Sequence, residues 1–193
     1  MTEHGTTEFH KELKRQSVHF LAGLFCIAAF ILLGKTQSIA LFILLLIAGY
    51  FFALRIKHRN AHPFLQELLK HTQRSHEEHF PGLPVFLFLA GAILTIGLFS
   101  NYYAALSGLI VLTFGDSMAT IIGKFFGNIK LVSNRTLEGT IAGIGLSTIT
   151  LLFLFQAPYA IIIATIGMLA EYLPIDDNIG IPLTAAITAT LLL

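Results

Sequence analysis

Charge is scarce in this chain. Asp, Glu, Lys and Arg together make up 12% of its 193 residues, whereas soluble domains carry about 25%. Hydrophobic residues reach 55%, and a water-soluble domain of this length cannot bury so much apolar surface. The composition therefore excludes an ordinary soluble domain. It predicts an integral membrane protein, for which the lipid bilayer acts as the solvent.

Cysteine is almost absent too, because Cys26 is the only one. It lies in an apolar run, so it forms no internal disulfide and we expect it to pack as a small hydrophobic side chain. A long polar stretch precedes the first apolar run, and that run is long enough to stay in the membrane. We therefore expect no cleaved signal peptide. The net charge is only +1, and we expect no nucleic-acid partner.

Long apolar runs dominate what remains. They predict an all-α, polytopic helix bundle of about seven transmembrane helices, in a single domain over 1–193. A polar segment over 1–16 precedes them, and the polar segment 55–82 has the spacing of an amphipathic helix lying on the membrane surface. The last run contains Pro182 and could instead be re-entrant. The expected spans are 17–34, 36–54, 83–99, 102–122, 139–155, 159–173 and 178–193.

Alternation of these spans across the membrane gathers the charges on one side. Eleven of the twelve Lys and Arg residues fall on the side of the 1–16 and 55–82 segments, and only Lys35 falls opposite. By the positive-inside rule, this side and the N-terminus are cytoplasmic. All eleven acidic residues map to the same side, which the topology rule does not explain. We therefore expect the active site on the cytoplasmic face.

Asp116 is the residue that most strongly indicates function. A carboxylate within a span costs about 2.5–3.5 kcal/mol on insertion scales, so it indicates a functional site unless it reaches water at the span end or pairs with a lysine. Asp116, Thr120, Gly123 and Gly127 share one helical face. Small residues at such spacing are also typical of a face that packs against another helix.

Cations around and beyond this face favour an anion site. Lys124 lies between the two glycines, and Lys130 and Arg135 follow within a few residues. Glycine lets a phosphate approach the backbone, and the cations neutralise its charge. Thr136 or Asn134 could cap the helix that opens the next span, and a helix start beside a glycine is also where phosphates bind.

Acidic residues near the last spans suggest a metal site. Glu171 lies near the end of one span, and Asp177 and Asn178 begin the next. Clustered oxygen ligands suit Mg²⁺, which takes one or two carboxylates plus substrate phosphates. The alternative is that Asp177 or Asn178 only caps its helix, and that Glu138 only favours the helix N-terminus beside it.

A further group lies on one helical face at the entrance to the first span, where Glu12, Arg15 and His19 recur at intervals of three and four. His19 could accept a proton, donate to an anion, or simply lie at the membrane interface. The remaining histidines are scattered along the polar segments. Their scattered spacing indicates no metal site, and the His76-Glu77-Glu78-His79 stretch lacks the His pair four residues apart that helical zinc sites use.

Taken in order, these blocks resemble the CTP-dependent lipid kinase family of dolichol and polyprenol kinases, phytol kinases and CTP-using diacylglycerol kinases. The resemblance covers nearly the whole chain. Gln16 and Arg135 depart from it, because both stand where the family commonly has Lys. The residues that match the family pattern are Glu12, Arg15, His19, Pro81, Gly82, Gly115, Asp116, Ala119, Gly123, Gly127, Thr136, Glu138, Gly139, Thr140, Glu171, Asp177, Asn178 and Pro182.

The resemblance implies transfer of the γ-phosphoryl group of CTP to a membrane lipid alcohol of the polyprenol, dolichol, phytol or diacylglycerol class, with Mg²⁺ as cofactor. Asp116 would be a metal ligand or base, with His19 and Arg15 as further catalytic residues. The triphosphate would bind at Gly115, Gly123, Lys124, Gly127, Lys130, Arg135, Thr136 and Gly139. The metal would be held by residues from the set Asp116, Glu138, Glu171, Asp177 and Asn178.

Two other functions stay open at this point. CTP:phosphatidate cytidylyltransferases share a similar Asp, Gly and Lys-Thr-x-Glu-Gly stretch, but they carry a late block with Gly-Gly and paired Asp residues. Here that region has Asp176, Asp177 and Asn178 followed by Ile-Gly-Ile-Pro. A small membrane transporter or scaffold would also contain intramembrane carboxylates, although it would not explain why the charges gather on one side.

Overall fold

The protein is a helical bundle over all the residues that the structure describes. The computed structural model describes residues 3–57, 83–132 and 135–193. These form helices and connecting turns without a β-strand, apart from a single bridge between Lys130 and Thr136. The all-α prediction is therefore confirmed for this part of the chain. The expected amphipathic segment lies outside the described residues beyond its first three positions.

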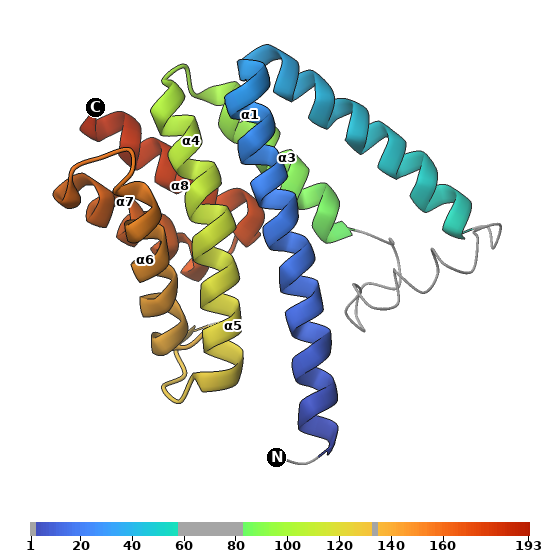
Figure 1. Cartoon of the computed structure of the whole chain (residues 1–193), viewed down its shortest axis with the longest axis vertical. Coiled ribbons are helices and arrows are strands. Elements are labelled where there is room, and N and C mark those ends of the chain that lie inside the picture. The colour runs from blue at the N-terminus through green and yellow to red at the C-terminus, as the bar shows by residue number, and fades with distance from the viewer. Residues whose placement is uncertain (1–2, 58–82, 133–134) are drawn as a thin grey trace.

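The first two expected spans form one long helix with a sharp kink. Helix α1 runs over Glu3–Lys57, and its backbone departs from helical geometry at Gly34, where φ is 75° and ψ is −178°. Only glycine adopts this conformation at little cost. The kink turns the second half of α1 away from the bundle axis (Figure 1). Helix α1 also begins earlier than the expected span, and this brings Glu12 and Arg15 onto the same helix as His19.

Lys35 directly follows the kink and links it by hydrogen bonds to the turn between α3 (Leu83–Leu98) and α4 (Tyr102–Ile110). Its Nζ donates to the carbonyl oxygens of Gly97 at 2.9 Å and Phe99 at 3.0 Å. These carbonyls belong to the end of α3 (Leu83–Leu98) and the turn after it, so they have no partner within the helix. The one cation that falls on the side opposite to the others therefore has a structural role as a C-cap.

A second continuous helical segment carries Asp116. Asn101 accepts hydrogen bonds from the backbone N–H groups of Tyr103 and Ala104 and so caps α4 (Tyr102–Ile110). The helix continues through a π-helical stretch, η1 (Val111–Asp116), into α5 (Ser117–Phe126). A regular α-helix was expected over this span. The π-turn is the difference, and such turns often occur at functional sites.

The last third of the chain adds α6 (Leu137–Leu151), α7 (Ala157–Leu169), the short 3₁₀ helix η3 (Ala170–Tyr172) and α8 (Asp177–Leu192). Helix α8 packs against α3, α4 and α7. It stays helical through Pro182. Pro182 lacks the N–H that would bond to the carbonyl oxygen of Asn178, and that oxygen instead faces Gly91 of α3, where a side chain would clash.

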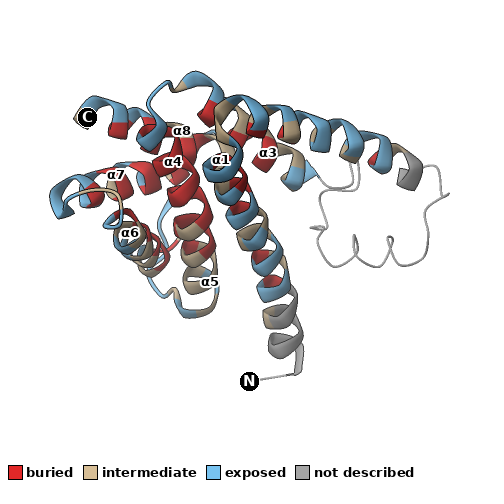
Figure 2. Ribbon diagram, turned by 45° about the horizontal axis from the view of Figure 1, so that its top comes forward, coloured by how far each residue is buried: buried red, intermediate tan, exposed pale blue. Residues whose placement is uncertain are grey.

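Burial is greatest in the middle of this bundle and least along the second half of α1 (Figure 2). Among the described residues, two helical segments are long and apolar enough to cross a membrane, Glu12–Leu54 and Tyr102–Phe126. Four shorter apolar helices accompany them. Large apolar side chains remain exposed on the outside of the bundle, among them Leu32, Leu98 and Phe153. Cys26 is buried and unpaired, as predicted.

Candidate functional site

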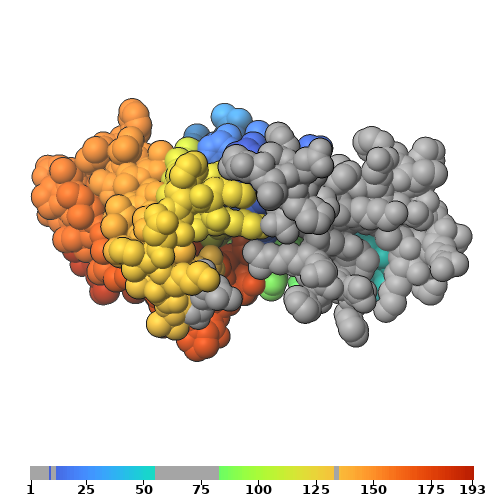
Figure 3. Space-filling model, turned by 90° about the horizontal axis from the view of Figure 1, so that it is seen from below, coloured from blue at the N-terminus to red at the C-terminus, as the bar shows by residue number. Residues whose placement is uncertain are grey.

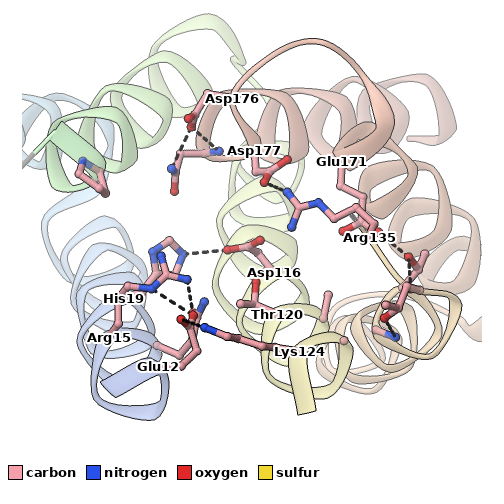
Figure 4. A pocket seen from close by; sticks show the side chains of 18 of the residues that line it. Glu12, Arg15, His19, Asp116, Thr120, Lys124, Arg135, Glu171, Asp176 and Asp177 are labelled. Atoms are coloured by element: carbon pink, nitrogen blue, oxygen red, sulfur yellow. Dashed lines mark hydrogen bonds and ion pairs between the residues drawn. The ribbon is translucent and has the colours of Figure 1, made fainter. Parts of the chain in front are cut away.

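Most of the residues that sequence reasoning singled out line one cavity of about 680 Å³. It lies at the end of the bundle where α6 and α8 begin, and α1, α3 and α5 also contribute walls (Figure 4). Viewed from this end, the connection between α5 and α6 lies beside the segment that leads into α8 (Figure 3). Segments far apart in the sequence therefore meet here.

Glu12 joins the two cations on the α1 side of the cavity. Its carboxylate pairs with Arg15 one turn further along α1, and its Oε2 lies 2.9 Å from Lys124 Nζ on α5. Glu12 is only 8% exposed, and a buried carboxylate is stable only with such partners. It therefore fixes a guanidinium and an ammonium group side by side, facing the cavity (Figure 4).

His19 and Asp116 face each other across the centre of the site. The distance from His19 Nε2 to Asp116 Oδ2 is 3.3 Å. The His19 ring also packs edge-on against Phe88 of α3, with ring centroids 4.7 Å apart. This packing limits the rotation of the imidazole. A histidine held against a carboxylate in this way can take up a proton in the pair.

The π-turn sets the position of Asp116. Its extra residue per turn shifts the register of the helix just before α5 begins. Beside it, η1 packs tightly on α1, since a side chain at Gly23 would meet Thr113 Oγ1 at 2.3 Å. On the other side, a side chain at Gly115 would meet Ser147 and Met168. Asp116 is thus held between two closely packed neighbours and is only 7% exposed.

The glycines after Asp116 bring α5 and α6 into close contact. A Cβ on Gly139 would lie 2.6 Å from the carbonyl oxygen of Ala119 and 2.9 Å from the Cα of Gly123. Gly127 similarly faces Thr136. This geometry supports the packing interpretation of the small-residue face. Gly123 and Gly139 nevertheless also line the cavity, whereas Gly127 and Gly115 do not.

Thr136 begins α6 and is its N-cap, as one of the two sequence alternatives predicted. Its Oγ1 accepts a hydrogen bond from the backbone N–H of Gly139 at 3.2 Å. Arg135, directly before it, forms an ion pair with Asp177 in the first turn of α8. This pair links the α5–α6 connection to α8 across the cavity (Figure 4). A predicted phosphate ligand and a predicted metal ligand thus neutralise each other here.

The start of α8 supplies further polar groups to the cavity. Asp176 is the N-cap and accepts hydrogen bonds from both the backbone N–H and the side-chain amide of Asn178. The side-chain oxygen Oδ1 of Asn178 is buried and has no hydrogen-bond partner. The side-chain oxygen Oε1 of Gln16 on α1, which also lines the cavity, is likewise buried and has no hydrogen-bond partner. Buried acceptors without partners are rare in proteins and indicate a ligand or a water that completes them.

Glu171 lies in η3, directly after α7, and is only 3% exposed. Its Oε1 accepts a hydrogen bond from Thr140 Oγ1, and that hydroxyl also contacts the Tyr172 hydroxyl. Glu171 lines the cavity opposite α1. The structure therefore brings Asp116 to the same cavity as Glu171 and Asp177, which lie more than fifty positions later in the sequence.

Besides Gly115 and Gly127, two further predicted site residues, Glu138 and Lys130, lie outside the cavity lining. Glu138 is outside the cavity lining, and its carboxylate accepts hydrogen bonds from the backbone N–H groups of Asn128 and Ile129. Together with its own backbone N–H, these donors hold the pKa of Glu138 below its ordinary value. Its placement fits the capping alternative and gives no support to a metal role. Lys130 is exposed and also lies outside the lining.

The cavity also contains residues that sequence reasoning left out of the site. Thr120 and Thr140 are hydroxyl-bearing lining residues, and the spacing of Thr120 from Asp116 was a usable signal because residues four apart share a helix face. Asp176 was noted only as part of an acidic cluster. The apolar wall, which no motif indicated, consists of Leu83, Pro84 and Leu87 on α3.

Carboxylates outnumber cations in the cavity. The five carboxylates are those of Glu12, Asp116, Glu171, Asp176 and Asp177, and the three cations are Arg15, Lys124 and Arg135. With His19 neutral, the wall carries two excess negative charges. The N-termini of α6 and α8 add only partial positive charge. A polyanionic substrate therefore needs an additional cation in this cavity.

A magnesium ion fits this donor set. The available groups are oxygen atoms, which hard cations prefer, and they include the unpartnered Oδ1 of Asn178. Among the described residues, no three His, Cys, Asp or Glu side chains lie close enough together to hold a metal by themselves. Mg²⁺ is commonly bound by one or two carboxylates together with substrate phosphates, and Asp116, Asp177 and Asn178 all line the cavity and offer oxygen donors for that mode.

The chain is similar to an uncharacterized protein, MJ1137, of Methanocaldococcus jannaschii. The two are 30% identical over 187 residues, and the match covers 91% of each chain. No protein-family model matches the chain, and no solved structure matches it.

Proposed function

We propose a function for this chain, a member of the family of the uncharacterized Methanocaldococcus jannaschii protein MJ1137, from the chemistry of its cavity. The protein is a membrane-embedded phosphotransferase that moves the γ-phosphoryl group of CTP to a lipid alcohol. The resemblance of its sequence blocks to the CTP-dependent lipid kinases indicates CTP as the phosphoryl donor and a lipid alcohol as the acceptor. The cavity supplies the residues for the reaction.

One observation carries this proposal. A buried His19–Asp116 pair lies in the same cavity as Arg15, Lys124 and Arg135. Phosphoryl transfer requires mainly positioning and charge stabilisation, together with a group that receives the proton of the attacking hydroxyl. The cations would hold the triphosphate, and the pair would accept that proton. A transporter or scaffold has no need for this combination at one end of an apolar bundle.

The reaction follows directly from these roles. The hydroxyl oxygen of the lipid forms a bond to the γ-phosphorus, and the bond from that phosphorus to the β–γ bridging oxygen breaks. CDP leaves with the electron pair, and the hydroxyl proton passes to the His19–Asp116 pair. Arg15 and Lys124 stabilise the charge that spreads over the phosphoryl oxygens. The product is a lipid phosphate.

Mg²⁺, held by Asp116 with Asp177 or Asn178 and by the phosphates, would offset the excess negative charge and stabilise the triphosphate. Binding of the nucleotide also changes the partners of Arg135. In the structure Arg135 pairs with Asp177. When phosphate and metal are present, the guanidinium can bind phosphate oxygens and the carboxylate can turn to the metal.

The membrane arrangement is part of the proposal. We propose that both halves of α1, α3, the α4–α5 segment, α6, α7 and α8 all cross the bilayer, with the N-terminus and the cavity on the cytoplasmic side. Seven apolar segments in alternating order and the one-sided charge distribution support this arrangement. A cavity at the cytoplasmic boundary gives access to soluble CTP and to a membrane lipid at the same time.

The position of the label in the product tests the proposal. Purified protein in lipid vesicles is supplied with Mg²⁺, a panel of lipid alcohols and lipid phosphates, and CTP labelled at either the γ- or the α-phosphorus. We expect γ-label in the lipid fraction and α-label only in soluble CDP. Transfer of α-label to a lipid phosphate acceptor would instead identify a cytidylyltransferase, because that reaction attacks the α-phosphorus. Absence of any transfer across the panel would overturn both enzyme assignments.

A further inference from the structure

The cavity has two kinds of wall. The α1, α5, α6 and α8 walls carry charged or polar groups, glycine and Ala119, whereas the α3 wall consists of Leu83, Pro84 and Leu87. A triphosphate gains nothing from leucine side chains. The α3 wall is therefore suited to the hydrocarbon part of a substrate and not to the nucleotide.

This apolar wall continues along α3 beyond the cavity. Leu83, Leu87, Ala90, Leu94 and Leu98 recur at intervals of three and four residues, so they share one face of the helix. Leu83 and Leu94 are each 40% exposed and Leu98 is 67% exposed, while Leu87 and Ala90 are half-buried. At a rise of about 1.5 Å per residue, this strip is roughly 22 Å long.

Within the described part of the chain, the neighbours of α3 leave this face open. The second half of α1 approaches α3 at Phe86, where a side chain on Gly49 would lie 3.4 Å from the Phe86 ring. On another side, α8 approaches so closely that a side chain on Gly91 would clash with Asn178. The strip lies between these two contacts on the helix surface. It forms an apolar track from the outside of the bundle into the cavity.

The inner end of the track lies next to the reactive pair. Leu87 precedes Phe88, and the Phe88 ring packs against His19 at a centroid distance of 4.7 Å. His19 in turn faces Asp116. A hydrocarbon chain on Leu83 and Leu87 would therefore place a terminal polar group at the His19–Asp116 pair. The cations Arg15, Lys124 and Arg135 line the same cavity, on α1, on α5 and directly before the N-cap of α6.

We propose that the strip Leu83, Leu87, Ala90, Leu94 and Leu98, which we call the α3 track, is the binding site for the hydrocarbon tail of the acceptor alcohol. The tail lies along α3 with its hydroxyl end at Leu87, and the nucleotide occupies the side lined by α5, α6 and α8. The inference rests on the proposed lipid acceptor. It adds the position and direction of that substrate.

Photolabelling tests the position without requiring turnover. The probe is a long-chain lipid alcohol with a diazirine a few carbons from the hydroxyl, incorporated in vesicles with the unmodified protein and no nucleotide. We expect adducts on the peptide that contains Leu83 and Leu87. A second probe with the diazirine at the tail end should label near Leu94 and Leu98. A matched probe that carries a methyl ether in place of the hydroxyl defines the background of lipid contacts.

Adducts of the first probe on α6 or α7, or a pattern equal to that of the methyl ether, would overturn the α3 track. The result is independent of phosphotransfer, because labelling needs neither CTP nor catalysis. Failure of the kinase assignment would appear only in the label-transfer experiment. The two failures are therefore distinguishable.

A pair of variants on the same helix gives a kinetic readout. Leu87→Trp fills the inner end of the track, and we expect it to raise the KM for the lipid alcohol about tenfold while the KM for CTP stays unchanged. Val85→Trp places the same bulk at a site that is 53% exposed and outside the track, and it should leave both constants unchanged. Equal effects of the two variants on the lipid KM would contradict the proposal.

Discussion

At the scale of single residues, the functional importance of Asp116 could be predicted from the sequence, whereas its partner and its position could not. A carboxylate in an apolar segment was visible in the sequence, and its cost in a membrane already indicated function. The sequence could not identify its partner, because His19 lies almost a hundred positions away on another helix. It also could not predict the π-turn that sets its position, since no residue in 111–116 is specific for that geometry.

Asp116→Asn should reduce turnover by roughly 100-fold or more while the protein still folds. The amide keeps the size of the side chain but removes the charge that would hold Mg²⁺ and attract the proton of the hydroxyl, and general-base catalysis alone is worth about 10²–10⁴-fold. Turnover is measured by transfer of γ-label from CTP to the lipid over a Mg²⁺ titration. Near-normal turnover in folded Asp116→Asn protein would rule out the role we give this carboxylate.

Glu138→Gln is the matched control, because it makes the same chemical change outside the cavity. We expect its turnover to stay near that of the parent protein. Its stability in detergent should fall at neutral pH, since the carboxylate accepts backbone N–H groups. A lowered pKa means that this contribution is present when the group is ionised and is lost as the pH falls. The stability difference should therefore shrink in acid.

At the scale of elements, the helices were more predictable than the turns and connections between them. All seven expected spans correspond to apolar helical segments, because long runs of apolar residues leave little alternative. Two features depend on contacts between elements and were not predictable. The sharp turn at Gly34 separates the two expected spans, but its geometry depends on contacts such as that of Lys35 with the end of α3. The Glu138 carboxylate accepts hydrogen bonds from backbone N–H groups of the α5–α6 connection and does not line the cavity. Its position depends on how that connection folds.

The contact between α5 and α6 gives a prediction at this scale. Gly139→Ala should destabilise the protein by about 1–3 kcal/mol, because the new methyl group would overlap the carbonyl oxygen of Ala119 and the backbone of Gly123. Gly145→Ala on the same helix is the control. Nothing lies within 4 Å of a side chain there, and alanine favours a helix over glycine by roughly 0.5–1 kcal/mol.

Thermal unfolding in detergent measures both variants. Gly139→Ala should lower the midpoint temperature, and Gly145→Ala should leave it unchanged or raise it. A pair of equal shifts would show that α5 and α6 do not approach each other as closely as the structure indicates.

At the scale of the whole molecule, most charged side chains of the described residues gather at the end of the bundle that contains the cavity. The end with the cavity holds Glu12, Asp116, Arg135 and Asp177, while the opposite end has Lys35 as a cap on two carbonyl groups. The sequence predicted this polarity because alternation of apolar runs sorts charged segments to one side. The two-walled shape of the cavity was not predictable, because it depends on the position of α3 relative to α1 and α8.

The last prediction concerns the sidedness of this arrangement in the membrane. Single cysteines are placed in a Cys26→Ala background at Ser100 and at Lys130, both of which are exposed. Ser100 is preferable to its neighbour Asn101, because Asn101 caps α4 and its replacement would weaken that helix. In intact cells, a membrane-impermeant thiol reagent should label the cysteine at position 100, since the turn between α3 and α4 lies at the end remote from the cavity. The cysteine at position 130 should react only after the cells are permeabilised, because the α5–α6 connection lies at the cavity end, which we place in the cytoplasm. The opposite pattern would put the cavity outside the cell, where no pool of CTP exists to supply the reaction, and the proposed phosphotransfer would then be untenable.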